Sequence, residues 1–263
     1  MEYVIVTGSY GGMGSETVKK LVALGYTVFA FDMNVKPSEK GVIPIKVLIN
    51  KLDSVKMAYN EVLKYTNKIK AIIHFAGIYE LDSLVEISEE RFKNIMEINF
   101  FGPFYVNKTF LPLLQADARI IITTSELAPL DPLPFTGIYA ISKAALDKYA
   151  YSLRMELQLL NIKVSVLRAG AVKTKLLDTS TTELDNFVNN TKLYKCNAQR
   201  FKAIVQSVEA QSIMPTKLAS KVIKILNQLN PKFDYHINRN FYLRLLNILP
   251  HRLQFFIIKQ ILK

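Results

Sequence analysis

The stretch Thr7–Gly14, TGSYGGMG, decides the fold that this sequence predicts. It follows an apolar run at 2–7 and leads into a helical pattern at 13–24, so we expect a strand, a tight turn and a helix in succession. Glycines in such a turn let the backbone approach a pyrophosphate, whose charge the helix N-terminus can meet. The glycines could serve the turn alone, but the strand, turn and helix together favour a dinucleotide site.

The alternation of apolar runs with helical patterns continues to about residue 170 and predicts βαβ units with a parallel sheet. We therefore predict an α/β protein with one doubly wound Rossmann-fold domain at 1–236, followed by an apolar, basic helical extension at 237–263. Strands are expected at 2–7, 27–31, 42–49, 70–75, 118–124 and 163–168, and helices at 13–24, 53–66, 88–115 and 136–160.

The size and composition of the chain fit one large domain. It has 263 residues, half of them hydrophobic, which is enough to bury a full core. Its one cysteine, Cys196, excludes an intrachain disulfide and is typical of an intracellular protein. The N-terminus lacks the pattern of a cleavable signal peptide, and no window reaches about 18 uninterrupted apolar residues. We expect a cytoplasmic protein that its basic tail could bring to a membrane.

The net charge of +12 is concentrated in the last third of the chain. Residues 187–263 hold 13 Lys and Arg against two acids, Glu209 and Asp234, whereas residues 1–186 are nearly neutral. Such a field can attract phosphates, nucleic acid or an anionic membrane surface. Because the basic region is also apolar and carries no nucleic-acid motif, we do not expect nucleic acid as a partner.

The second expected strand ends in Asp32, about 20 residues after the glycine turn. A carboxylate at this place can accept hydrogen bonds from the adenosine ribose hydroxyls, and it would repel a 2′-phosphate. The glycine turn itself contains no Arg or Lys. The sequence therefore predicts NAD in preference to NADP.

A second motif lies in the expected helix 136–160. Tyr139 and Lys143 are four residues apart, so on a helix the phenol and the ammonium share a face. A free phenol has a pKa of about 10, and a fixed neighbouring cation can lower it by stabilising the phenolate. The pair suits proton transfer, although the same spacing also occurs on solvated helix faces.

With Asn99 and Ser125, these motifs resemble the classical short-chain dehydrogenases/reductases in both order and spacing. The resemblance covers nearly the whole chain, up to about residue 230. It implies a Rossmann fold, an NAD(P) cofactor and the interconversion of an alcohol and a ketone. The apolar tail is similar to that of the retinol and hydroxysteroid dehydrogenase branch of the family.

The resemblance also implies a role for each residue of the motifs. Tyr139 would be the general acid/base that exchanges a proton with the substrate oxygen, and Ser125 would hold that oxygen. Lys143 would lower the pKa of the phenol and bind the nicotinamide ribose. Asn99 would bind a water that links Lys143 to solvent, and it could also satisfy backbone groups as a buried helix residue. No metal site is expected, and the cofactor would be held, besides Tyr139 and Lys143, by Gly8, Tyr10, Gly12, Met13, Gly14, Asp32, Leu48, Ile49, Ala76, Gly77, Val172 and Thr174.

Three positions depart from the family pattern. His74–Gly77, HFAG, replaces the usual Asn-Asn-Ala-Gly, so the Asn that often braces the central sheet is absent and Phe75 is the departing position. His74 is expected to be a core residue at a strand end. The usual adenine-binding Asp aligns with Leu48, and Ala169–Gly170 replaces Pro-Gly. These departures favour a rival hypothesis, a non-catalytic dinucleotide sensor or scaffold that binds a partner through its basic tail. The intact Ser, Tyr and Lys favour an enzyme.

Two segments are expected beyond the carboxyl ends of the strands, where open parallel sheets bind ligands. The segment 126–136 carries three prolines and would form a stiff wall. The segment from about 175 to 200 could close as a lid. Both offer mostly apolar contacts, which favours a lipophilic secondary alcohol or ketone over a polyol, although such residues could also pack on the body of the protein. The apolar side chains of the second segment are Leu176, Leu177, Phe187 and Tyr194.

The sequence closes with two short, apolar and basic helical patterns at 238–263, separated by Pro250. Three roles fit this tail equally well: an interfacial anchor on anionic lipid, a cover over the substrate pocket, or a contact with a partner subunit. The family resemblance further implies a homodimer or homotetramer built on the helices expected at 88–115 and 136–160.

Overall fold

The computed structural model describes residues 2–263, except for the side chains of residues 175–181. The described chain forms one parallel sheet of seven strands in the order β3-β2-β1-β4-β5-β6-β7. This order confirms the predicted doubly wound Rossmann fold. The strands are β1 (Tyr3–Thr7), β2 (Thr27–Asp32), β3 (Val42–Lys46), β4 (Ile69–His74), β5 (Leu114–Thr123), β6 (Lys163–Ala169) and β7 (Asp234–Ile237).

Helices and helical turns account for most of the rest of the described chain. The first half of the chain contains α1 (Gly12–Ala23), α2 (Leu52–Leu63), α3 (Glu89–Met96), the π-helical segment η1 (Glu97–Phe101), α4 (Gly102–Phe110) and the 3₁₀ turn η2 (Leu111–Leu113). The second half contains α5 (Gly137–Leu157), the 3₁₀ turn η3 (Gln158–Leu160), α6 (Lys175–Asn190), α7 (Lys195–Glu209), α8 (Pro215–Asn227), α9 (Phe241–Ile248) and α10 (His251–Leu262).

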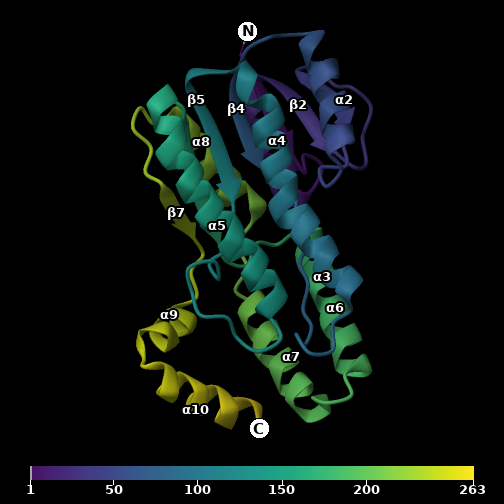
Figure 1. Ribbon diagram of the computed structural model, residues 1–263, viewed down its shortest axis with the longest axis vertical. Coiled ribbons are helices and arrows are strands. Elements are labelled where there is room, and N and C mark those ends of the chain that lie inside the picture. The colour runs from purple at the N-terminus through teal and green to yellow at the C-terminus, as the bar shows by residue number, and fades with distance from the viewer. Residues whose placement is uncertain (1) are drawn as a thin grey trace.

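The sheet is covered on both faces, so its central strands are buried on both sides (Figure 1). α1 and α8 pack together against one face. α2, α4 and α5 cover the other face, where the largest apolar cluster lies. Successive strand residues alternate between the two clusters, as Ile5 and Val6 do, because side chains along a strand point to opposite faces.

The helix expected at 88–115 is not continuous. It begins as predicted, where the Ser88 hydroxyl caps α3 by accepting a hydrogen bond from the Arg91 N–H. The π-helical segment η1 then widens the helix before α4, and Pro112 lies in a 3₁₀ turn that leads directly into β5. The strand therefore begins at Leu114, four residues earlier than its apolar run indicates, and β3 ends at Lys46 rather than at residue 49.

Several elements after residue 170 were not predicted, among them α6, α7, α8 and β7. β7 has only four residues, DYHI, and pairs in parallel with β6, so it completes the sheet without a recognisable apolar run. α8 begins with Pro215 and buries Leu218 and Val222 against the sheet. Both follow residue 170, where the alternating pattern that predicts βαβ units ends.

The helices α6, α7, α9 and α10 lie together beyond the carboxyl ends of the strands (Figure 1). The tail forms two helices, α9 and α10, and Pro250 precedes the second, as the sequence predicts. No helix among the described residues is long and apolar enough to cross a bilayer. These four helices form a separate layer at the end of the sheet where ligands of this fold bind.

Candidate active site

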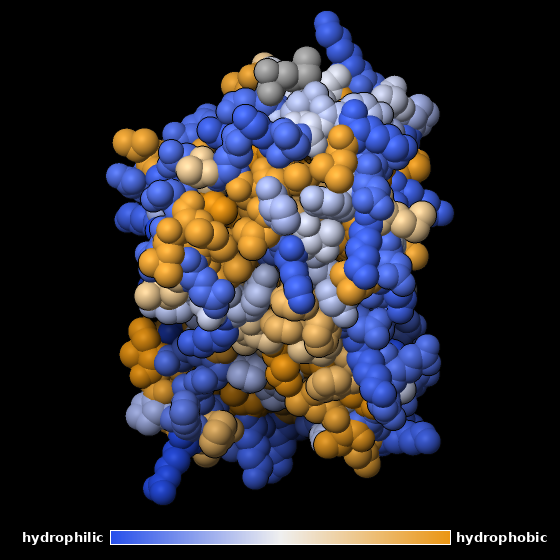
Figure 2. Space-filling view, turned by 45° about the horizontal axis from the view of Figure 1, so that its top comes forward, coloured by the Kyte–Doolittle hydropathy of each residue, from blue (hydrophilic) through white to orange (hydrophobic). Residues whose placement is uncertain are grey.

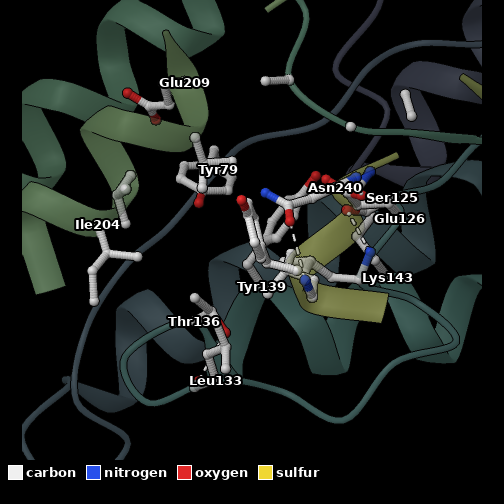
Figure 3. A pocket seen from close by; sticks show the side chains of 18 of the residues that line it. Tyr79, Ser125, Glu126, Leu133, Thr136, Tyr139, Lys143, Ile204, Glu209 and Asn240 are labelled. Carbon is white, nitrogen blue, oxygen red and sulfur yellow. Dashed lines mark hydrogen bonds between the residues drawn. The ribbon is translucent and has the colours of Figure 1, made fainter. Parts of the chain in front are cut away.

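A cavity of about 590 Å³ lies beyond the carboxyl ends of the strands. Its lining extends from Met13 and Gly77 to side chains of α7, α9 and α10. Figure 3 shows Ser125, Tyr139 and Lys143 within it, with Ile204 of α7. One cavity thus joins the glycine turn to the tail, with the predicted catalytic residues between them.

Three of the predicted catalytic residues meet in this cavity. Ser125 lies two residues after β5, and Tyr139 and Lys143 lie in the first two turns of α5. The hydroxyls of Ser125 and Tyr139 share a hydrogen bond, and the Lys143 Nζ lies 5.7 Å from the centre of the Tyr139 ring. All three side chains are less than a tenth exposed, so the group is shielded from bulk water.

A buried ion pair fixes the elements that carry this group. The Asp147 carboxylate on α5 accepts hydrogen bonds from Arg168 at 2.7 and 3.0 Å, and Arg168 lies on β6. The Thr124 hydroxyl, at the end of β5, donates to the same carboxylate at 3.2 Å. Arg168 also pairs with Asp234 of β7 at 3.0 Å. These contacts fix the position of Ser125 relative to α5, and no local sequence pattern predicts them.

Burial controls the proton affinities of the pair. It raises the pKa of Tyr139 to about 12, which the Ser125 hydrogen bond only partly offsets, and the nearby Glu126 carboxylate raises it further. Burial lowers the pKa of Lys143 to about 8. In the protein alone, burial thus has the largest influence on the pKa of both groups.

Asn99 is fully buried in the π-helical segment η1. Short π-helical segments are frequent at functional sites. Its Oδ1 accepts from the Ile78 N–H at 2.8 Å, and its Nδ2 donates to the Ile78 carbonyl at 2.9 Å and to the Ser142 Oγ at 3.0 Å. The Ser142 hydroxyl in turn donates to the Tyr139 carbonyl. Asn99 thus braces both the loop after β4 and the first turn of α5, which bears out its structural role.

The glycine turn is packed so closely that side chains would not fit. Gly8 has a positive φ of +65°, and a Cβ there would lie 2.6 Å from the Ala76 nitrogen. A Cβ at Gly14 would lie 2.1 Å from the Gly8 carbonyl oxygen, and one at Gly12 would lie 2.7 Å from the Thr174 Cγ2. The turn therefore leaves a cradle of bare backbone at the N-terminus of α1, which fits a pyrophosphate.

The remaining predicted cofactor residues line the edge of the sheet next to this cradle. The Asp32 carboxylate accepts from the backbone N–H groups of Tyr10 and Asn34 at 3.0 and 3.1 Å, so it faces the glycine turn. Leu48 is 42% exposed, whereas Ile49 is buried in the core against Gly102 and can offer only its backbone. Residues that line the cavity itself are Met13, Gly77, Val172 and Thr174.

The predicted wall and lid are only partly correct. Leu127, Leu133 and Pro134 of the wall line the cavity. Phe187 and Tyr194 of the lid do not, because they pack against Phe135 at 4.7 and 5.2 Å between ring centres, outside the cavity. The apolar lining on this side comes instead from α7. The side chains of Leu176 and Leu177 lie outside the described residues.

His74 is a core residue, as predicted. It is 2% exposed, and its Nε2 lies 2.8 Å from the Asn107 Oδ1. Burial lowers its pKa to about 4, so the ring is neutral at physiological pH. Its Nδ1 is buried without a hydrogen-bond partner among the described residues, which adds to the cost of charging the ring.

Sequence reasoning missed two residues in the cavity. The Tyr79 ring packs edge-on against Tyr139, with 4.5 Å between ring centres. Glu126 is 8% exposed, and its Oε2 accepts from the Asn240 N–H of the tail at 2.7 Å (Figure 3). Burial raises the pKa of Glu126. For Glu126, the available signal was an acid directly after Ser125, at the start of the expected wall.

The family of the chain follows from comparison with known proteins. A family model described as short chain dehydrogenase matches residues 2–185. The chain belongs to this family, and it is an oxidoreductase of the class that acts on CH–OH groups with a nicotinamide nucleotide. The resemblance stated from the sequence is therefore confirmed.

Two curated relatives differ in how much of them the chain covers. It is 26% identical over 235 residues to a 3-ketodihydrosphingosine reductase of Bacteroides thetaiotaomicron, a match that covers 88% of this chain and 86% of that protein. It is 31% identical over 188 residues to estradiol 17-beta-dehydrogenase 2 of Mus musculus, covering 66% of this chain and 49% of that one. The chain thus spans about half the length of the mouse relative.

Solved structures share the fold. A short chain dehydrogenase family protein from Francisella tularensis has a TM-score of 0.75 at 23% identity, covering 90% of this chain and 97% of its own. A short chain dehydrogenase from Burkholderia cenocepacia J2315 in complex with NADP has a TM-score of 0.73 at 19% identity, covering 100% of both chains. At such identities the likeness concerns the fold alone.

Proposed function

We propose that the protein is an NAD(H)-dependent enzyme that interconverts a lipophilic secondary alcohol and the corresponding ketone. One observation carries this proposal. The buried Tyr139 hydroxyl, hydrogen-bonded to Ser125, lies midway along an apolar cavity that connects the glycine cradle to the tail. A phenol in this place can meet a substrate oxygen while the carbon of that substrate faces the nucleotide end.

In the direction of reduction, the Ser125 hydroxyl would hold the ketone oxygen, and Tyr139 would give it a proton as the alcohol forms. The nicotinamide supplies the hydride when it is bound. Because burial keeps the phenol protonated, Tyr139 suits the donor role at neutral pH. Lys143 would return the proton to the phenol. Asn99 and Lys143 both lie next to Gly77, and Asn99 would bind the water that links Lys143 to solvent.

The proposed preference for NAD rests on Asp32. Its carboxylate lies at the end of β2 against the glycine turn, where it could bind ribose hydroxyls and would repel a 2′-phosphate. The cradle would be formed by Gly8, Gly12 and Gly14 with the N–H groups of α1. One relative of known structure carries NADP, so the preference is a property to be measured on this chain.

The proposed substrate class rests on the lining of the cavity. Apart from the catalytic group, it is mostly apolar, and its outer end is formed by aliphatic side chains of α7, α9 and α10. Such a lining excludes the many hydroxyls of a polyol, because they would find no partners there. The names of the two curated relatives, a ketosphingoid reductase and an estradiol dehydrogenase, both refer to lipophilic compounds.

Calorimetry with NADH and NADPH, followed by a nicotinamide-absorbance screen, tests the proposal. We expect NADH to bind at least about tenfold more tightly than NADPH, a difference of about 1.4 kcal/mol. We expect turnover with steroids, retinoids or long-chain ketones and little with small polyols. Binding of neither nucleotide would favour the rival scaffold hypothesis and contradict the enzyme.

We also propose a homodimer built on α4 and α5. The outer side of α5 and of the turn η3 that follows it exposes the apolar side chains Tyr151, Met155 and Leu159, each more than half exposed. Figure 2 is turned by 45° from Figure 1, in which α4 and α5 face the viewer, and it shows several apolar patches between hydrophilic ones. Light scattering should give twice the chain mass, and Leu159→Glu with Met155→Glu should yield the monomer.

A further inference from the structure

The tail is fastened across the cavity by polar contacts at both of its ends. At its start, the Asn240 N–H donates to Glu126, and the Asn247 Oδ1 accepts from the Asp131 N–H at 2.6 Å. At its far end, the Asn197 Nδ2 of α7 donates to the Leu262 carbonyl at 2.6 Å. α9 and α10 are therefore held across the end of the cavity that faces away from the sheet and cover it in part.

The inner side of the tail lines the cavity, and its edge forms the mouth. Leu243, Leu246 and Ile258 line the cavity and are not exposed. Tyr242 and Ile261 also line it, yet they are 75% and 53% exposed. Residues that are both cavity-lining and exposed lie at an opening, so the cavity opens to the outside along the tail.

The outer side of the tail is apolar as well. Phe241 and Ile248 are 66% and 77% exposed on α9, and Phe255 and Phe256 are 67% and 59% exposed on α10. Residues 241 and 248 are seven apart and so share one face of their helix. Two amphipathic helices with large exposed aromatic and aliphatic side chains, placed beside a cavity mouth, leave an apolar surface without a cover.

The charge around this surface favours one kind of cover. The tail carries five cations and, after Asp234, no acid, and all five cations are exposed. A second copy of the chain, packed about a two-fold axis, would bring these like charges together. An anionic lipid surface complements them and also accepts the apolar side chains. The cations are Arg239, Arg244, Arg252, Lys259 and Lys263.

We propose that α9 and α10 dock on an anionic lipid surface, with their outer side in the headgroup region and the cavity mouth open to the bilayer. A lipophilic substrate would then pass from the membrane into the cavity without crossing water. The docking stands on the tail alone, whereas the route for substrate rests on the proposed function.

Co-sedimentation of the full chain with vesicles tests the docking. Vesicles of phosphatidylcholine with about 30% phosphatidylglycerol should bind the protein at least about tenfold better than phosphatidylcholine alone. Phe255→Ser with Phe256→Ser, and separately Arg252→Glu with Lys259→Glu, should each lower this binding about tenfold or more. Lys217→Glu with Lys224→Glu, which changes two exposed cations of α8, is the matched control and should bind as the unaltered chain does.

Thermal melting and NADH calorimetry on the same variants show whether each remains folded. Equal vesicle binding by the tail variants, the control and the unaltered chain would overturn the docking, as would the absence of binding. A concentration-dependent dimer that Phe255→Ser with Phe256→Ser abolishes without vesicles would also overturn it, in favour of a second copy.

A kinetic arm separates the docking from the proposed function. For a ketone presented in anionic vesicles, the tail variants should raise KM about tenfold at unchanged kcat, while KM for a short water-soluble ketone should not change. Docking without any turnover would refute the proposed enzyme and leave the docking intact. Equal KM shifts for both ketones would refute the membrane route.

Discussion

The two ends of the cavity are built from different parts of the chain. At the nucleotide end, backbone lies against backbone, and a Cβ at Gly8 would meet the Ala76 nitrogen at 2.6 Å. At the tail end, the lining consists of flexible side chains such as Leu246 and Ile258. Backbone contacts cannot give way, whereas side chains can repack. The nucleotide end should therefore tolerate almost no substitution, and the tail end should adapt to different substrates.

The largest effect should come from Gly8→Ala. It adds a backbone clash to a positive φ and should cost about 3 kcal/mol or more of unfolding free energy, with loss of NADH binding. Gly25→Ala is the matched control, since Gly25 also has a positive φ, +87°, but has nothing within 4 Å of the added Cβ. It should cost only about 1 kcal/mol. Urea unfolding measures the free energy of unfolding of both variants. Similar losses of this free energy would show that the close approach of Gly8 to Ala76 is unimportant.

The next largest effect should be that of His74 on the free energy of unfolding at acid pH. His74 has a pKa lowered to about 4, below its unfolded value of about 6.5, so the unfolded chain takes up the proton first. Its stabilising contribution is present above about pH 6.5 and is lost as the pH falls toward about 4, by roughly 3 kcal/mol in total. His74→Asn should flatten this loss, and the exposed His251→Asn should not. Melting curves between these pH values decide the matter, and parallel slopes for all three proteins would count against it.

At the tail end, Leu246→Ala should act on substrate alone. Removing part of the lining should raise KM for a bulky ketone about tenfold and leave NADH affinity unchanged. Ile248→Ala on the same helix is the control, because Ile248 is 77% exposed and does not line the cavity. Steady-state kinetics with both variants would contradict the assignment if their KM values rose together.

The smallest effect should be that of Glu126→Gln. Burial raises the pKa of Glu126 in the folded protein, so its contribution to stability is present below its ordinary pKa and is lost as the pH rises through the folded value. Glutamine keeps an oxygen for the Asn240 N–H and removes the buried charge. The variant should melt about 1–3 °C higher at about pH 8 and show no gain at about pH 4. The exposed Glu156→Gln should change neither, and a gain for Glu126→Gln that is independent of pH would rule out the charge as its cause.

The features that could be predicted from the sequence are those that depend on local patterns. The glycine turn, Asp32, and the pair Tyr139 and Lys143 were predictable because each is a local pattern within one strand, turn or helix. The parallel sheet followed from the alternation of such patterns. β7 could not be predicted in this way, since four residues gain their strand form only by pairing with β6.

Contacts between residues far apart in the chain could not be predicted from a single sequence. The Glu126–Asn240 and Asp147–Arg168 pairs join residues 114 and 21 positions apart. The sequence indicated that the tail is apolar and basic, but not which side would line a cavity and which would be exposed. Burial raises the pKa of Tyr139, and a single sequence cannot show the degree of burial because it depends on the whole fold.

The most direct test of the account is the turnover of Tyr139→Phe in the nicotinamide-absorbance assay, with Tyr151→Phe as control. Tyr151 lies on the same helix but is 54% exposed, so the two variants remove the same hydroxyl inside and outside the cavity. We predict that Tyr139→Phe loses about 10³-fold or more in kcat while NADH still binds, and that Tyr151→Phe is unaffected. Comparable turnover in the two variants would contradict the assignment of Tyr139 as the proton donor, and with it the proposed reaction.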